Sequence, residues 1–284
     1  MKIQNEVMIE SANTSFSVCM SVYMNDNASD FITAVKSVYN QTTPPNEIVL
    51  VVDGPIGDSL KKAIEHIAEE IPIINVIWLA ENCGHAIARQ TGMEAAKHGL
   101  IAIMDSDDIS LPNRFQQQLA VFEENPDVTV VGGLINEFID DINNVVGMRW
   151  VPQTDEDIKQ YLKDRCPMNL VTVMFRKDHV QNVGGYIDWY CEEDYYLWIR
   201  LALAGYKFYN IQHNLVNVRV GSDMYNRRGG TRYFKSEYAL QKLMLEEKII
   251  TPIKFLSNVV KRFIVQVILP NNIRGWVFRK FARK

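Results

Sequence analysis

The sequence is short of cysteine and of long apolar segments. Its 284 residues include four cysteines, no two of them spaced as a CxxC pair, which excludes a disulfide-stapled scaffold and predicts reduced thiols. Residues 1–17 contain no apolar run of the kind that a signal peptide needs. The apolar stretch 263–269 near the C-terminus is interrupted by Gln266 and is too short to cross a bilayer. We therefore expect a cytoplasmic protein, either soluble or peripheral on the inner face of the cytoplasmic membrane.

Several common catalytic signatures are also missing. The five histidines have no zinc-binding spacing, and the chain contains no GxSxG, P-loop or GxGxxG motif. The sequence therefore carries no motif that points to a GxSxG hydrolase, a P-loop nucleotidase or a GxGxxG dinucleotide-binding protein. The formal net charge is −4, and we expect no nucleic-acid partner.

Acidic residues are absent from one end of the chain. All 34 of them precede Lys248, whereas nine of the 30 basic residues lie at or after that position. This predicts a basic C-terminal extension, 248–284, that meets something anionic or is simply solvated. Apolar residues at helical spacing follow in the extension, at Ile253, Leu256, Val259, Val260, Phe263, Ile264 and Val267. Such a helix favours docking on an anionic membrane surface. Packing on the rest of the protein, or a dimer contact, is the alternative.

Short apolar runs alternate with helical patterns through the first 110 residues. Strands are expected at 17–22, 48–52, 73–79 and 100–104, and helices at 30–39 (after an N-cap at Ser29), 60–68 and 86–96. This order predicts an α/β fold with a mostly parallel central sheet and helices on both faces. In the second half we expect strands at 129–133, 136–139, 171–175, 207–211 and 215–220, and helices at 112–124, 155–163, 194–204 and 231–247.

Polar side chains follow four successive predicted strands. Tyr23, Asp53, Asn82 and Asp105 stand at these exits, and ligands of such sheets bind at the carboxyl ends of the strands. The last exit is the acidic run Asp105-Ser106-Asp107-Asp108. In an extended segment Asp105 and Asp107 point to the same side and can share a divalent ion, although an acidic turn is the alternative.

The ordered motifs resemble those of inverting family 2 glycosyltransferases with the GT-A fold. The likeness runs from about residue 17 to 209, and is greatest with the non-processive members that build bacterial O-antigens and exopolysaccharides. It is carried by Ser21-Val22-Tyr23, Ser37 to Thr42, Glu47 to Pro55, Asn82-Cys83-Gly84 with Ala88-Arg89, Asp105 to Asp108 with Pro112 and Arg114, Gly184-Gly185-Tyr186, and Glu193 to Trp198. Each piece alone has little specificity, whereas their shared order is specific.

The resemblance implies a donor site and a metal site. Asp105 and Asp107 match the DxD motif that holds Mn²⁺ or Mg²⁺ against the diphosphate of a UDP- or dTDP-sugar. It assigns donor binding to Ser21, Tyr23, Asp53, Asn82, Arg89, Asp105 and Ser106, and to the basic loop with Arg227 and Arg228. Each assignment has a structural alternative. Asp53 could be a turn aspartate, Arg89 could pair on the surface with Glu94 or Asp53, and the basic loop could be an exposed turn.

The resemblance also implies a general base. Asp194, in the Glu193-Asp194 pair before a predicted helix, would take the proton of an acceptor hydroxyl, with Glu193 as second candidate. Asp194 is otherwise only a helix cap, and Trp198 is expected in the core rather than at the acceptor. We expect the acceptor to be a lipid-linked saccharide. The catalytic domain should span 1–247, with a nucleotide-sugar half at about 15–110 and an acceptor half at about 111–247.

Two other activities remain open at this point. A nucleotidyltransferase shares the α/β nucleotide-binding architecture, but residues 19–27 lack the Gly-rich phosphate loop that it usually carries. A non-catalytic nucleotide-sugar-binding protein would have little need of acidic residues at all of Asp105, Asp107 and Asp194.

Overall fold

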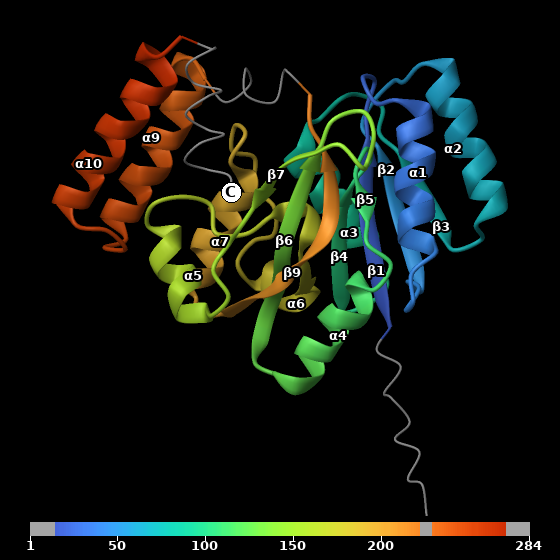
Figure 1. The fold of residues 1–284 in the computed structure, drawn as a ribbon, viewed down its shortest axis with the longest axis horizontal. Helices are drawn as coiled ribbons and strands as arrows, with labels where there is room; N and C mark the ends of the chain where they lie inside the picture. The colour runs from blue at the N-terminus through green and yellow to red at the C-terminus, as the bar shows by residue number, and fades with distance from the viewer. Residues whose placement is uncertain (1–14, 222–228, 271–284) are drawn as a thin grey trace, which may run out of the picture.

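A single nine-stranded sheet runs through the molecule (Figure 1). The computed structural model describes residues 15–221 and 229–270. The strand order is β3-β2-β1-β4-β8-β6-β9-β5, and β7 pairs with β6 at the side of this path. The strands are β1 (Phe16–Val22), β2 (Glu47–Val52), β3 (Ile74–Trp78), β4 (Leu100–Asp105), β5 (Ile109–Ser110), β6 (Val128–Phe138), β7 (Val145–Arg149), β8 (Met174–Arg176) and β9 (Lys207–Arg219).

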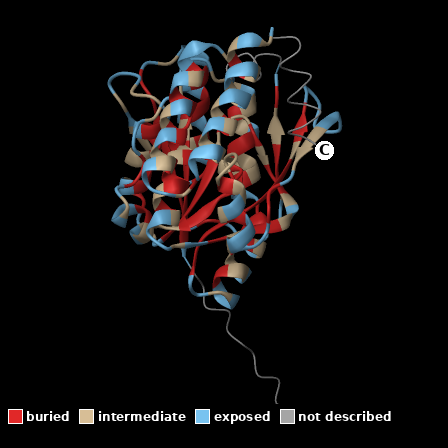
Figure 2. Ribbon diagram, turned by 90° about the vertical axis from the view of Figure 1, so that its left-hand side faces the viewer, coloured by how far each residue is buried: buried red, intermediate tan, exposed pale blue. Residues whose placement is uncertain are grey.

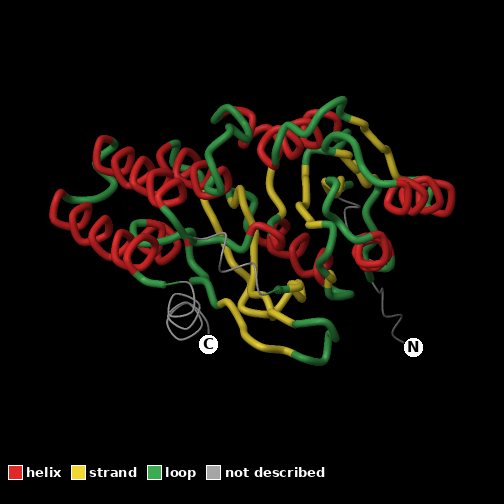
Figure 3. Tube along the Cα trace, turned by 90° about the horizontal axis from the view of Figure 1, so that it is seen from above, coloured by secondary structure: helices red, strands yellow, loops and turns green. Residues whose placement is uncertain are grey.

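The first four long strands pair in parallel, as the alternating pattern predicts. β3, β2, β1 and β4 are joined by the helices α1 (Ala28–Tyr39), α2 (Asp58–Glu70) and α3 (His85–Ala95). Side chains along β1 alternate between two cores, with Val18 and Met20 packed on the α1 and α2 side and Cys19 on the α3 side. Figure 3 shows the strands crossing the centre of the molecule with helices on either side of them.

The second half of the sheet is mixed. β6 and β9 are parallel neighbours, while β8 runs antiparallel to both β4 and β6. The helices of this half are α4 (Arg114–Glu124), α5 (Asp155–Leu162), α6 (Lys177–Asn182) and α7 (Glu193–Leu203). Trp198 on α7 is fully buried, which confirms its expected place in the core.

Four local predictions were wrong. The two strands expected within 129–139 form the continuous strand β6, and those expected within 207–220 form β9, because shifts in pairing register absorb the interruptions. Residues 171–175 are divided between a short 3₁₀ turn, η1 (Leu170–Thr172), and β8. The N-cap of α1 is Asn27, whose side chain accepts the backbone N–H groups of Ser29 and Asp30.

The chain continues after the sheet into a helical hairpin. Helix α9 (Thr231–Glu246) turns back into α10 (Pro252–Phe263), which ends in a π-helical segment, η2 (Ile264–Ile268). The hairpin lies at the opposite end of the molecule from α1 and α2 (Figure 1). In the part of the chain that the structure describes, no helix combines the length and apolarity needed to cross a membrane.

A glycine at the exit of β2 allows the loops after β2 and β3 to approach each other closely. Gly54 has a φ of +87°, and a Cβ atom there would lie 2.5 Å from the backbone nitrogen of Asn82. Only glycine avoids both the left-handed strain and the collision. The loops after β2 and β3 therefore depend on this residue for their close approach.

We expect Gly54→Ala to lower the free energy of unfolding by about 2 kcal/mol or more, since strain and a backbone clash add. Chemical denaturation measures the change. Gly99→Ala is the matched control, because the space around Gly99 is open and its φ is not positive. Equal stability of the two variants would contradict this account of the loop contact.

Candidate functional site

The predicted strand-end residues do meet at one edge of the sheet. Ser21 is in register with Val51 of β2 and with Asp105 of β4, so Tyr23, Asp53 and Asp105 lie at the carboxyl ends of three neighbouring strands. The sheet thus brings together residues that are up to 84 positions apart in the chain.

Asp53 organises the loop that leads into α3. Its carboxylate accepts hydrogen bonds from the backbone N–H groups of Cys83 at 2.7 Å and Gly84 at 3.0 Å, and from the Asn82 side chain at 3.1 Å. Asp53 is buried, and a carboxylate has room for a further donor. The amide of Asn82 is already engaged by Asp53, so it holds the loop in place.

A turn that sequence reasoning left unassigned ties β1 to the acidic run. One carboxylate oxygen of Asp26 accepts the backbone N–H of Tyr23 at 3.0 Å and the hydroxyl of Ser106 at 2.8 Å. Ser106, predicted to bind the donor, is buried and uses its hydroxyl for this contact. Asp26 lies in the turn-like sequence Asn25-Asp26-Asn27, which by itself does not show that Ser106 lies opposite.

The acidic residues raise one another's affinity for protons. Burial, together with the charges of Asp105 and Asp26, raises the pKa of Asp107 to about 6. Burial and the charges of Asp107 and Asp105 raise the pKa of Asp108 well above its usual range, although Asp108 accepts the backbone N–H of Arg219 at 2.8 Å. Burial likewise raises the pKa of Asp26. So much negative charge in one place favours a bound cation.

Arg89 was predicted either to bind the donor or to pair on the surface with Glu94 or Asp53. The surface pairing is wrong, because Arg89 is buried and one guanidinium nitrogen lies 2.5 Å from Glu193. Its other terminal nitrogen lies 3.4 Å from Asp105. Burial alone would lower the pKa of Arg89, but the charges of Asp105 and Glu193 outweigh it and raise that pKa. Arg89 therefore joins the acidic run to the start of α7 as a permanent cation.

Asp194 lies beside this ion pair but is bound differently. One of its carboxylate oxygens accepts the backbone N–H of Tyr195 at 2.7 Å, and the other lies 3.6 Å from the thiol of Cys166. Burial and the charge of Glu193 raise the pKa of Asp194, while Arg89 opposes the shift. The helix begins at Glu193 with Glu192 as its N-cap, so Asp194 belongs to the first turn and is not the cap. Sequence reasoning missed Cys166, since only the fold brings it near.

Arg227 and Arg228, which were predicted to bind the donor, lie outside the residues that the structure describes. In the ranges 15–221 and 229–270, no group of three or more His, Cys, Asp or Glu side chains is placed to hold a metal ion. If Asp105 and Asp107 held a divalent ion, they would fill only part of its coordination shell, and the remaining places would fall to a ligand or to water.

The chain matches a known family of enzymes. Residues 17–184 match the family described as glycosyl transferase family 2, and the chain belongs to that family. It is a glycosyltransferase with the GT-A fold.

Two curated relatives are similar over most of their length. The chain is 37% identical to the amylovoran biosynthesis glycosyltransferase AmsE of Erwinia amylovora, over 82% of this chain and 86% of that one. It is 32% identical to the UDP-Gal:alpha-D-GlcNAc-diphosphoundecaprenol beta-1,3-galactosyltransferase of Escherichia coli, over 95% of this chain and 97% of that one.

Solved structures share the fold at low identity. TarS 1-349 of S. aureus superposes with a TM-score of 0.62 at 17% identity, covering 93% of this chain and 78% of that one. A mannosyltransferase from Pyrobaculum calidifontis, solved with GDP-Man and Mn²⁺, superposes with a TM-score of 0.62 at 15% identity, covering 91% of this chain and 71% of that one.

We expect Arg89→Met to destabilise the protein by about 3 kcal/mol, because it leaves Glu193 and Asp105 without their buried cation. The deficit should shrink as pH falls, since protonating the carboxylates removes the unpaired charge. Denaturation at several pH values measures both effects. Lys61→Met is the control, because it breaks only an exposed pair with Glu65. An equal, pH-independent effect of both substitutions would contradict a central ion pair at Arg89.

Proposed function

We propose that the enzyme transfers a sugar from a UDP-sugar to a hydroxyl of a lipid-linked saccharide in the synthesis of a bacterial surface polysaccharide. Inversion by single displacement needs one base and one stabilised leaving group. The names of the two curated relatives support this substrate class: one names the biosynthesis of amylovoran in Erwinia amylovora, and the other names UDP-Gal and a GlcNAc-diphosphoundecaprenol acceptor. A dTDP-sugar donor is the less favoured alternative.

The donor half, about 15–110, contains the strand-end residues. In the proposed complex, Asp53 accepts a hydrogen bond from the base, Tyr23 and Ser21 line the nucleoside, and Arg89 faces the sugar or the diphosphate. Asn82 and Ser106 act through the loops that they hold. Arg227 and Arg228 stay assigned to the diphosphate or to the acceptor pyrophosphate. The acceptor half, about 111–247, supplies α7 with its acidic pair.

A divalent ion fits the acidic run. Burial, and after it the charges of Asp105 and Asp26, raises the pKa of Asp107, and a bound cation would offset these costs of keeping it ionised. Asp105 and Asp107 would hold Mn²⁺ or Mg²⁺, which offsets the charge that develops on the departing diphosphate. Arg219 lies close as well, donating to the backbone oxygen of Asp107 at 3.3 Å and pairing with Asp30 at 2.9 Å.

One observation favours Asp194 over Glu193 as the base. One carboxylate oxygen of Glu193 lies 2.5 Å from Arg89, so this carboxylate is engaged in an ion pair rather than directed at an acceptor hydroxyl. Asp194 has no such ion pair within the described residues, and burial raises its pKa toward the working range of a general base. Asp194 thus receives the proton of the acceptor hydroxyl, and Arg89 and Glu193 position the helix that carries it.

We expect Asp194→Asn to reduce transfer by roughly 10²–10⁴-fold with donor binding unchanged. Glu193→Gln should reduce transfer far less. Because the base must be deprotonated, the rate falls as pH drops through the pKa of Asp194. Burial and then the charge of Glu193 raise that pKa, so Glu193→Gln should move the acidic limb to lower pH. Product formation followed from pH 4 to 9 checks both variants, and a larger loss for Glu193→Gln would make Glu193 the base.

We expect Mn²⁺ to bind weakly alone and on the order of tenfold or more tightly with UDP, since two carboxylates fill few places of an octahedral shell. Calorimetry with and without UDP measures the difference. Asp107→Asn should abolish it, whereas Asp58→Asn on the exposed start of α2 should not. Tight Mn²⁺ binding without nucleotide, or turnover unaffected by EDTA, would contradict a shared metal site.

We also propose that the enzyme works from the cytoplasmic side at an anionic membrane surface, where a lipid-linked acceptor would lie. Support comes from the basic C-terminal extension.

A further inference from the structure

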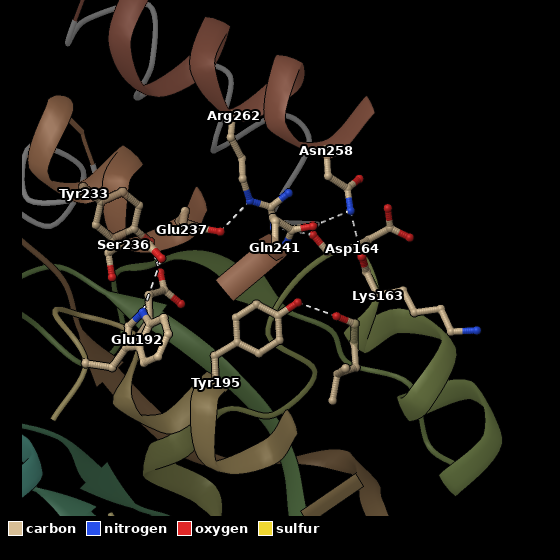
Figure 4. Close-up of polar contacts among 12 residues, drawn as sticks. Lys163, Asp164, Glu192, Tyr195, Tyr233, Ser236, Glu237, Gln241, Asn258 and Arg262 are labelled. Atoms are coloured by element: carbon tan, nitrogen blue, oxygen red, sulfur yellow. Dashed lines mark hydrogen bonds and ion pairs between the residues drawn. The ribbon is translucent and has the colours of Figure 1, made fainter. Parts of the chain in front are cut away.

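Helix α10 turns its polar side toward the protein (Figure 4). Arg262 pairs with Glu237 of α9 and donates to the backbone oxygen of Asp164 at 2.7 Å. Asn258, which is buried, donates to the side chain of Gln241 at 2.9 Å and to the backbone oxygen of Lys163 at 2.8 Å. Asn258 and Arg262 are four residues apart and therefore lie on one face of α10. The polar contacts fix how α10 is rotated against α9 and the end of α5.

The apolar side of α10 therefore points outward. The exposed apolar side chains are Ile253 (83%), Leu256 (63%), Val260 (47%), Phe263 (43%), Ile264 (43%) and Ile268 (59%). We refer to these six residues as the apolar stripe. Figure 2, in which the hairpin faces the viewer, shows exposed stretches along its outer helices. A surface helix of a globular protein ordinarily buries its apolar face, so the orientation here is reversed.

Neighbouring aromatic and basic side chains extend this surface. Phe234 of α9 contacts Phe263 edge-on, and the exposed Tyr238 contacts Phe255. Lys261 is exposed within the same helix, and Lys235 is exposed one turn before Tyr238. No acidic residue follows Lys248 in the sequence. The stripe is thus continuous with aromatic side chains. Within α10, Lys254 pairs with Asp164 and Arg262 with Glu237, so the exposed Lys261, together with Lys235 of α9, supplies the positive charge beside the stripe.

We infer that the apolar stripe of α10 and η2 inserts into the interface of an anionic bilayer, an inference that rests on the proposed lipid-linked acceptor. Apolar burial attracts the stripe, and basic residues add attraction to acidic lipid headgroups. A second copy of the chain fits less well, because pairing two stripes brings two segments of like charge together. A contiguous exposed apolar surface of this kind marks an interaction site.

The same hairpin holds the segment that leads into the acidic pair. Tyr233 of α9 donates to the carboxylate of Glu192 at 2.5 Å, and Ser236 donates to the backbone oxygen of Tyr190 at 2.6 Å. The indole of Trp189 donates to the backbone oxygen of Ser236 at 3.3 Å. Docking of the stripe would therefore set the position of Asp194 relative to the membrane surface.

Flotation of the full chain with vesicles tests the inference. Vesicles containing phosphatidylglycerol should retain the protein, and phosphatidylcholine vesicles should retain less. We expect Leu256→Gln with Val260→Gln to weaken retention by about tenfold or more, since both side chains lose apolar contact. Val146→Gln is the matched control, because Val146 on β7 is also exposed, at 47%, and lies away from the hairpin. Light scattering without lipid measures the oligomeric state of each variant.

Transfer to a short-chain, detergent-soluble acceptor separates this inference from the proposed function. The double variant should transfer sugar to that acceptor at the parent rate, which also shows that it is folded. Retention of the double variant at the parent level, or equal retention of the parent on neutral and anionic vesicles, would overturn the inference. A parent dimer that the double substitution dissociates would overturn it in favour of a second copy. Absence of transfer by the parent itself would count against the proposed function instead.

Discussion

The buried cation of Arg89 is the constraint on which the rest of the site depends. It lies between Glu193 at the start of α7 and Asp105 at the end of β4, and so connects two parts of the chain that are separated by 88 residues. Without it, two carboxylates would be left near three further acidic groups, Asp26, Asp107 and Asp108, whose pKa values burial and mutual repulsion already raise. A buried charge left without its partner is more costly than the pair itself is favourable. The Arg89 ion pairs therefore stabilise the site and hold the acidic run next to the acidic pair.

The sequence allowed the first half of the fold to be predicted closely. Its strands are continuous apolar runs and its helices have regular spacing, and both signals are local. The expected meeting of Tyr23, Asp53 and Asp105 at one edge followed from the parallel order of the strands. The second half was less predictable, because the lengths of β6 and β9 depend on bulged pairing between segments far apart in sequence.

The partners of the site residues could not be predicted in the same way. Arg89 on a helix with Glu94 nearby is consistent with a surface pair, and only the folded structure shows that its partner is Glu193, 104 residues further along the chain. Cys166 and Asp26 carry no sequence signal for their contacts with Asp194 and Ser106. For α10, the spacing of apolar residues predicted an apolar stripe but not whether it faces the protein or the solvent. The polar contacts of Asn258 and Arg262 decide that the stripe faces outward.

We propose that Asp105, Asp107 and Arg89 form one site for the donor diphosphate and its metal ion. A crystal structure with UDP and Mn²⁺, with the metal located by its anomalous scattering, tests this most directly. We expect a manganese peak between the two carboxylates and the diphosphate oxygens, with the nucleotide base near Asp53. A diphosphate bound elsewhere, or a manganese ion that contacts neither aspartate, would contradict it.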